Sequence, residues 1–553
     1  MPEDVLVRHF LTQFVESDFS PDTDRHQVLA VAAAAVITVP LFVTVFMSVK
    51  YLMHPLQASG WTETTLMGDE VTFCAASLLV AAAVALLEWD ALALDARDTA
   101  ILGVLPVARR TIVRAKLTAL ATFASVFAIA LNAVPSLLHP LLMSAQLPMS
   151  PLMLIPLALA HAVSTVAAAL FGFAAVVAIR EALFATIGPA RFHRWSNRVR
   201  SPLLFAVLLM LALVPVRLSD SAAWMFDRER PHVLLQPVGW FAAGHAALAG
   251  RLLDGLPRPD MPPRLAAEET RLTMRYRAAL PRLTNDALTG AAIVVATVLV
   301  SIALYIGNAR RIHLLIDGPS RHARRSIGRV AVGLVGSSSM RTGFLFGVRA
   351  LIRSSLHRVY MLVALAAGIA LFMALREGPI RTLTLAAQTL LVAAIVAGFR
   401  AGVRTAADYR AMWIFDVTET GGTARFRDGV RLSGLLLAAT AVAVLFPIAR
   451  SQWGCKIAIA HAVDGLAIGW LLVELAMIDV ERPLVVSIPP SDGMNTVGVV
   501  LGGAAVIAIF IAAHVELATL TSTAGVLLYP LVFAALAFAI HIRHSAFAIR
   551  LRH

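Results

Sequence analysis

Lysine is nearly absent from this chain of 553 residues, in which only Lys50, Lys116 and Lys456 occur. A phosphate-binding P-loop needs the pattern G-x-x-x-x-G-K-[ST], because its backbone N–H groups and its lysine hold the phosphates. None of the three lysines stands in that pattern. We therefore expect no ATPase within the chain and no cofactor bound by it.

Cysteine is equally scarce, since the chain has only Cys74 and Cys455. Two cysteines without a C-x-x-C spacing build neither a disulfide framework nor a metal site of that type. We expect both thiols to serve packing and no metal to be bound. The acidic stretch at 1–24 also lacks a basic segment followed by a cleavage site, which argues against a cleaved signal peptide.

Charged side chains are few as well. They make up 15% of the residues, against about 25% in soluble proteins. Hydrophobic residues reach 59%, and the mean hydropathy is +0.78. The net charge of +13 lies mostly in arginines beside apolar segments, where positive charge orients a chain in a membrane and attracts anionic lipid. The composition therefore predicts membrane lipids as partners and no nucleic acid.

Long apolar runs are abundant, and a spanning helix needs about 20 such residues. Their number predicts an all-α integral membrane protein of about 12 transmembrane helices, arranged as two six-helix halves. The first half has expected spans at 28–50, 70–88, 116–138, 151–178, 201–217 and 286–306. The second half has them at 357–375, 381–400, 431–449, 456–478, 495–513 and 521–541.

The loops between these spans alternate in arginine content. Segments 51–69 and 139–150 have no lysine or arginine, whereas the loops after the second, fourth and sixth spans are rich in arginine. Cytoplasmic loops hold the excess of positive charge. The pattern thus predicts a multi-pass membrane protein with cytosolic termini.

The two halves resemble one another. Residues 157–163 read LALAHAV and residues 457–463 read IAIAHAV, each at the fourth span of its half. Each half also opens with apolar residues at helical spacing, which predicts a helix lying in the inner membrane interface; a helix docked on its neighbours is the alternative. These residues are Leu6, Phe10, Leu11 and Phe14, then Phe344, Val348, Leu351 and Ile352.

The expected organisation has four parts. Residues 1–27 form the interfacial helix and residues 28–306 the first transmembrane half, with an external loop at 218–285. Residues 307–340 form a basic cytosolic linker. Residues 341–553 form the second half with its own interfacial helix.

The loop after the second span has the densest pattern. A short apolar helix ends in Leu-Pro-Val and is flanked by charges of both signs, which suits insertion into a groove on a cytosolic partner. The residues concerned are Asp95, Arg97, Asp98, Leu102, Leu105, Pro106, Val107, Arg109, Arg110 and Lys116.

This stretch, DARDTAILGVLPVARRTIVRAKL, resembles the loop after the second span in type-2 ABC exporter permeases. In that family the loop carries a coupling helix that docks on an ATP-binding subunit, and an amphipathic amino-terminal helix precedes the first span. The resemblance implies a permease of the bacterial inner membrane that has no enzymatic activity of its own. It further implies coupling to a separate ABC ATP-binding subunit that holds ATP and Mg²⁺.

The corresponding loop of the second half keeps an apolar stretch beside basic residues but lacks Leu-Pro-Val. Its candidate coupling residues are Tyr409, Arg410, Trp413 and Phe415. Whether this second loop binds an ATPase is left open by the sequence.

Four ionisable residues stand within apolar spans: His161, His461, Asp464 and Glu474. An aspartate at the centre of a membrane helix costs about 2.5–3.5 kcal/mol. His461 and Asp464 are three residues apart on one face, so the imidazole is expected to offset that cost. The residues either form a path for protons or substrate or make structural bonds between helices.

Two other functions fit parts of the sequence. An ion-coupled secondary transporter also uses repeats with polar residues at mid-membrane. An intramembrane prenyltransferase-like enzyme would use Asp90, Asp95 and Asp98 to hold a magnesium diphosphate, although a second aspartate-rich loop is missing.

Overall fold

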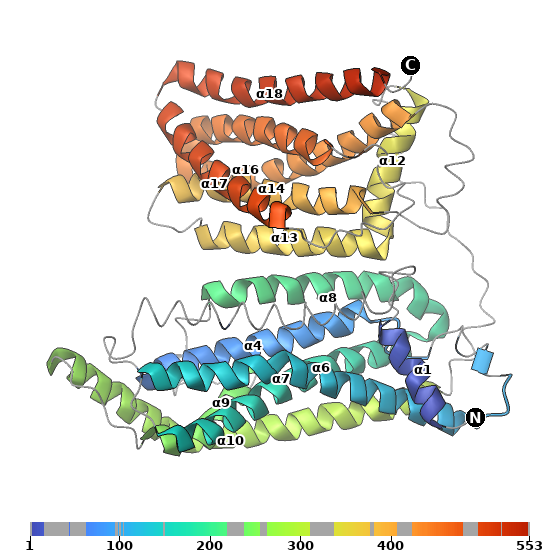
Figure 1. Ribbon diagram of the computed structural model, residues 1–553, viewed down its shortest axis with the longest axis vertical. Coiled ribbons are helices and arrows are strands. Elements are labelled where there is room, and N and C mark those ends of the chain that lie inside the picture. The colour runs from blue at the N-terminus through green and yellow to red at the C-terminus, as the bar shows by residue number, and fades with distance from the viewer. Residues whose placement is uncertain are drawn as a thin grey trace. The chain divides into compact units, whose positions relative to one another are not determined.

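A computed structural model of the chain contains only helices among the residues that it describes, in agreement with the all-α expectation (Figure 1). The described residues are 3–15, 44, 62–94, 98, 101–102, 104–146, 150–217, 237–254, 263–309, 337–375, 381–405, 423–478, 480, 496–520 and 522–550.

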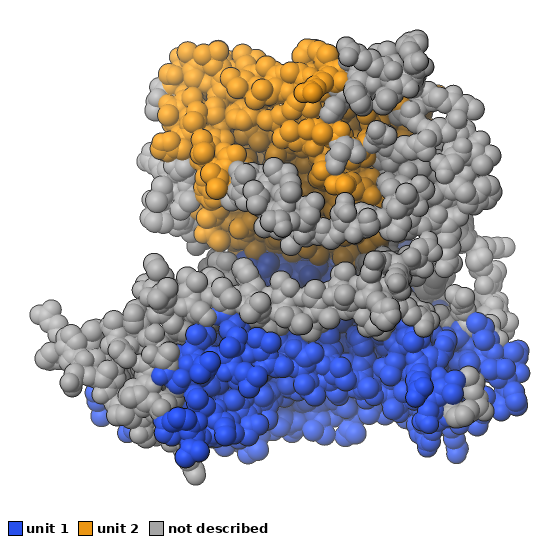
Figure 2. All heavy atoms as spheres, viewed as in Figure 1, with its two compact units in different colours: residues 1–320 blue, residues 321–553 orange. Residues whose placement is uncertain are grey.

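The chain divides into two compact units, residues 1–320 and 321–553 (Figure 2). Unit 1 has α1 (Glu3–Val15), α4 (Thr62–Leu87), α6 (Arg109–Gln146), α7 (Pro151–Ile187), α8 (Pro189–Arg217), α9 (Pro237–Asp254) and α10 (Pro263–Ala309). Unit 2 has α12 (Ser338–Arg353), α13 (Ser355–Leu375), α14 (Arg381–Val403), α16 (Thr423–Ala476), α17 (Thr496–Thr519) and α18 (Thr523–Arg550).

Within the described ranges, nine helices are long and apolar enough to cross a membrane. A helix covers every predicted span except 28–50, which lies almost wholly outside the described residues. The chain is therefore a multi-pass membrane protein. The total of twelve spans and the cytosolic side of the termini stay predictions.

Two of the predicted spans share one element. Spans 431–449 and 456–478 both lie in α16, which bends at Gly454. Gly454 has a φ of 81°, a left-handed conformation that glycine adopts without steric cost. The glycine therefore separates the two parts of α16 that correspond to the two predicted spans.

The segment predicted as an external loop, 218–285, contains α9 and the first part of α10. Helix α9 packs against α10, α7 and α4, and Ala242, Ala243 and Ala246 are buried in that contact. The small alanine side chains allow α9 to lie close to its neighbours. Figure 1 shows α1 at one end of unit 1 and α9 toward the other.

The helices pack in the same order in both units. Helix α1 lies on α6, α4 on α7 and α8, and α7 on α10. In unit 2, α12 lies on α16, α14 on α16 and α17, and α16 on α18. This agreement in packing accompanies the two similar seven-residue segments at 157–163 and 457–463, which are called heptads below without implying a coiled coil.

Close approaches between helices depend on glycine. A Cβ atom at Gly172 of α7 would lie 2.3 Å from the carbonyl oxygen of Leu78 in α4. In unit 2, Gly343 of α12 and Gly429 of α16 have the same role, because each would meet a backbone oxygen of the other helix at 2.0 Å. Small residues let the backbones of membrane helices approach in this way.

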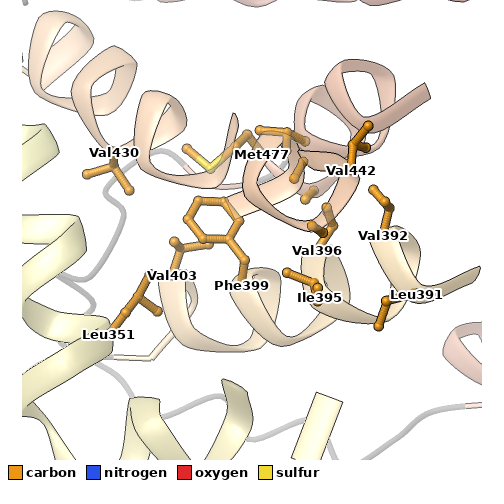
Figure 3. Packing of buried hydrophobic residues seen from close by; sticks show 14 of the residues in the cluster. Leu351, Leu391, Val392, Ile395, Val396, Phe399, Val403, Val430, Val442 and Met477 are labelled. Atoms are coloured by element: carbon orange, nitrogen blue, oxygen red, sulfur yellow. The ribbon is translucent and has the colours of Figure 1, made fainter. Parts of the chain in front are cut away.

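The largest apolar core lies in unit 2, around Phe399 of α14 (Figure 3). Val396, Val403 and Met477 belong to the same cluster. The ring also lies against α16, because a Cβ atom at Gly434 would be 2.7 Å from it. Elsewhere apolar side chains face outward. In the most apolar 18-residue stretch of α10, only 11% of the residues are buried. Such a face suits lipid or another membrane helix.

Candidate functional site

The residues directly after α4, where the predicted coupling loop begins, are tied to α7 and α8, and α10 supports the α7 contact. Arg180 of α7 donates from Nε to the carbonyl oxygen of Trp89 at 2.9 Å and pairs with Glu181. Arg200 of α8 donates to Asp90 at 3.0 Å. Asn308 of α10 donates to the Glu181 carboxylate at 2.8 Å. The start of the loop is therefore anchored to the bundle.

The middle of the loop is held by α1. Gln13 donates from Nε2 to Asp98 Oδ1 at 2.7 Å, and Lys116 donates to Gln13 Oε1 at 2.7 Å. The Lys116 ammonium also lies 4.6 Å from the centroid of the Phe10 ring. A buried lysine is tolerated here because hydrogen bonds and aromatic faces replace its hydration. Sequence reasoning placed Asp98 and Lys116 in a docking surface, and both side chains are buried under α1.

The apolar face of α1 is covered by protein. Leu6 and Phe10 are fully buried and pack with Leu102, Ala115 and Ala119. This contact matches the alternative in which the helix docks on its neighbours. At the start of α1, Arg114 hydrogen-bonds the Glu3 carboxylate and holds the pKa of Glu3 below its usual value.

The tip of the loop is exposed and apolar. Val104 is 82% exposed, Ile101 54% and Leu105 40%, whereas Leu102 between them is buried. Pro106, Arg109 and Arg110 are exposed, and Val107 packs partly under α1. An apolar turn held out on a fixed base and followed by exposed cations can contact a partner.

Several predicted residues lie outside the described ranges: Asp95, Arg97, Tyr409, Arg410, Trp413 and Phe415. Of the three aspartates considered for magnesium, Asp90 is paired with Arg200 and Asp98 is bonded to Gln13. These two carboxylates already have protein partners.

A second candidate site lies inside unit 1, around His161. The Nδ1 atom of His161 in α7 is 2.7 Å from Oε2 of Glu70 in α4. His245 of α9 has its Nε2 atom 3.9 Å from the same oxygen. The ring of His139 in α6 lies 5.0 Å from the His161 ring, centroid to centroid. All four side chains are buried.

Apolar and weakly polar groups surround this cluster. The edge of Phe73 contacts both His139 and His161, with ring centroids 5.0 Å apart in each case. Cys74 Sγ is 3.5 Å from Glu70 Oε1, so this thiol has a polar contact besides the packing expected of it. The cluster is therefore buried among α4, α6, α7 and α9.

The matching heptad of unit 2 also presents a histidine to a carboxylate. His461 of α16 contacts Glu516 of α17 through Nδ1, and both are buried. Asp464, expected as the partner of His461, lies against Glu516 instead. The expected pairing is thus replaced by one across two helices. Gln388 of α14 donates to the carbonyl oxygen of His461 at 3.1 Å.

Glu474 belongs to a different network. Its carboxylate is buried and lies 3.2 Å from Nε of Arg431 and 3.3 Å from Nδ1 of His541. Trp470 donates to it at 3.1 Å. The sequence grouped Glu474 with His461 and Asp464, whereas the structure gives it separate partners on α16 and α18.

Four residues of these clusters were missed by sequence reasoning: Glu70, His139, His245 and Glu516. Glu70 opens the expected span 70–88, and Glu516 follows the expected span 495–513. The available signal was that each of these two acidic residues borders a long run of apolar residues. His139 and His245 have no such local signal, because only the fold brings them to Glu70.

Comparisons with known proteins give no relative: no family model, no curated protein and no solved structure matches this chain.

Proposed function

We propose that this chain is the transmembrane permease subunit of a bacterial ABC exporter. It lies in the inner membrane with both termini in the cytosol and couples to a separate ATP-binding subunit. That subunit holds the ATP and Mg²⁺, and the permease itself is not an enzyme. Membrane lipids surround its exposed apolar helices.

The observation that carries this proposal is the exposed apolar turn after α4. Val104, Leu105 and Pro106 extend from a loop whose neighbouring residue Leu102 is buried. Exposing a large aliphatic side chain to water forgoes about 1.5–3 kcal/mol of burial. Covering the turn in a groove of the ATPase recovers that free energy, and Arg109 and Arg110 supply charge at its rim.

The base of the loop supports the same function. Hydrogen bonds connect its start to α7 and α8 through Arg180 and Arg200, and its middle to α1 through Gln13. A displacement of the tip by the ATPase would therefore be passed to several helices together. Mechanical coupling needs such a rigid connection.

Affinity purification of the tagged chain in mild detergent tests the proposal. We expect a P-loop ATPase to be recovered with the wild-type protein and to be lost with Val104→Asp and with Leu105→Asp. Trp195→Asp is the matched control, because Trp195 of α8 is 49% exposed and lies in a different segment that is also expected on the inner side. The control is expected to retain the ATPase.

The outcomes separate the candidates. Equal recovery of the ATPase by wild type and both loop variants would show that the turn is not the docking site. Recovery of no ATPase by an intact wild-type protein would overturn the exporter role.

A second function, ion-coupled secondary transport, is favoured by one observation. His461, Glu516 and Asp464 form a buried ionisable cluster inside unit 2, and proton relays in membranes use such groups. Substrate uptake into vesicles driven by a proton gradient without nucleotide, and abolished by Glu516→Gln, would support this function over the exporter.

A further inference from the structure

The cluster in unit 1 has more histidines than a pair with Glu70 needs. Glu70, His139, His161 and His245 come from four different helices, α4, α6, α7 and α9, and none is more than 5% exposed. The related heptad in unit 2 pairs His461 with Glu516 and has Trp453 against the imidazole, with ring centroids 5.1 Å apart. Beside the central histidine and its carboxylate, unit 1 has two further imidazoles, those of His139 and His245. Unit 2 instead has the indole of Trp453 and the carboxyl group of Asp464.

The donor atoms converge. One donor atom from each of Glu70, His139 and His161 lies within 4.8 Å of the other two. Zinc bonds of about 2.0–2.2 Å in a tetrahedron place donors about 3.3 Å apart. Side-chain shifts of about 1 Å would therefore close these three donors around one ion. His245 does not belong to the group of three, but its Nε2 atom is 3.9 Å from Glu70, so a larger shift would make it a fourth donor.

The Glu70 carboxylate is the centre of this set. Its Oε2 atom lies 2.7 Å from Nδ1 of His161 and 3.9 Å from Nε2 of His245. An ion bound here would take the place of the hydrogen bond between Glu70 and Nδ1 of His161. Donor atoms from different helices therefore meet at one carboxylate oxygen, which is the arrangement that a metal site needs.

We propose that Glu70, His139, His161 and His245 bind one divalent transition-metal ion of the zinc class. Imidazole and carboxylate donors select this class over Mg²⁺ and Ca²⁺, which prefer sets made of oxygen atoms. The buried setting suits a structural or regulatory ion, because Phe73 packs against two of the histidines and limits their rotation. The site joins α9 to the transmembrane helices α4, α6 and α7. The proposal does not rest on the exporter function.

The test uses the full-length protein in detergent, purified through a tag without histidines. The protein is stripped with a chelator, incubated with Zn²⁺ or Co²⁺, desalted and analysed for metal by mass spectrometry. We expect one Zn²⁺ per chain, no retained Mg²⁺, and the visible absorption of tetrahedral Co²⁺. Glu70→Gln, His139→Asn and His161→Asn should each weaken zinc binding by about tenfold or more.

His461→Asn is the matched control, because it removes the histidine of the related heptad. It should bind zinc as the wild type does. Zinc should also raise the unfolding temperature of the wild type and of His461→Asn, but not that of His139→Asn. If His161→Asn does not fold, His139→Asn and His245→Asn still report on the site, because neither removes the bond between His161 and Glu70.

Two results would overturn the proposal. One is a wild-type protein that retains no zinc and shows no tetrahedral Co²⁺ spectrum. The other is zinc binding by the unit 1 variants equal to that of the wild type, which would assign the metal to other residues of the chain.

Discussion

Glu70 and His161 meet between α4 and α7 with Oε2 and Nδ1 2.7 Å apart, both fully buried. Removing Glu70 leaves the buried Nδ1 atom of His161 without this partner. We therefore predict that Glu70→Ala lowers the free energy of unfolding of the metal-free protein by about 2–5 kcal/mol. Glu70→Gln should cost less, because its amide oxygen still accepts a hydrogen bond. Denaturant unfolding in detergent measures both, and an unchanged midpoint for Glu70→Ala would contradict the pairing.

The two native cysteines and one new cysteine test the proposed orientation. Cys455 is exposed at the bend of α16 and lies outside the cell in our topology, whereas Cys74 is buried. An impermeant thiol reagent should therefore label Cys455 on intact cells. A Val104→Cys substitution in a Cys455→Ser background should be labelled only after permeabilisation. Labelling of that variant on sealed cells would reverse the orientation and remove the coupling role of the loop.

Lys116 is predicted to hold α1 in place. Its ammonium bonds to Gln13 and lies over the Phe10 ring, so Lys116→Met should remove a charge-assisted hydrogen bond of about 1.5–3 kcal/mol. Hydrogen exchange of α1 should become faster. Arg114→Ala is the comparison, since its partner Glu3 is on the surface and exposed ion pairs contribute little. Exchange rates that rise equally in both variants would argue against a special role for Lys116.

Gly172 is predicted to set the distance between α4 and α7. In Gly172→Ala the new methyl group would lie 2.3 Å from a backbone oxygen of Leu78, which cannot rotate away. Overpacking of this kind costs about 1–3 kcal/mol or more. At Gly307 of α10 the same change meets no atom within 4 Å and should stabilise the helix by about 0.5–1 kcal/mol. The midpoint temperature of thermal unfolding should fall for Gly172→Ala and rise for Gly307→Ala.

Much of the helical framework could be predicted from the sequence because membrane helices follow composition and length. The spans at 151–178 and 381–400 lie within α7 and α14. The bend at Gly454 was also signalled, since two apolar runs flank it in the sequence. The extension of α10 back to Pro263 was not, because that part is polar and its helix depends on packing against α9.

The candidate sites were predicted less completely. Val104 and Leu105 lie at an exposed tip of the kind that the loop pattern indicates, but Asp98 and Lys116 are buried anchors of α1. Spacing along one helix paired His461 with Asp464, whereas the closer carboxylate is Glu516, 55 residues away. Contacts between distant helices have no signature in a single sequence, and both histidine clusters depend on such contacts.

The carboxylates that meet the two heptad histidines arrive on different helices, from α4 in unit 1 and from α17 in unit 2. A movement of α17 alone would part His461 from Glu516. The same movement of its counterpart α8 would leave Glu70 against His161. The two units would therefore respond differently to the same helix movement. It would separate the histidine from its carboxylate in unit 2 and leave the pair in unit 1 together.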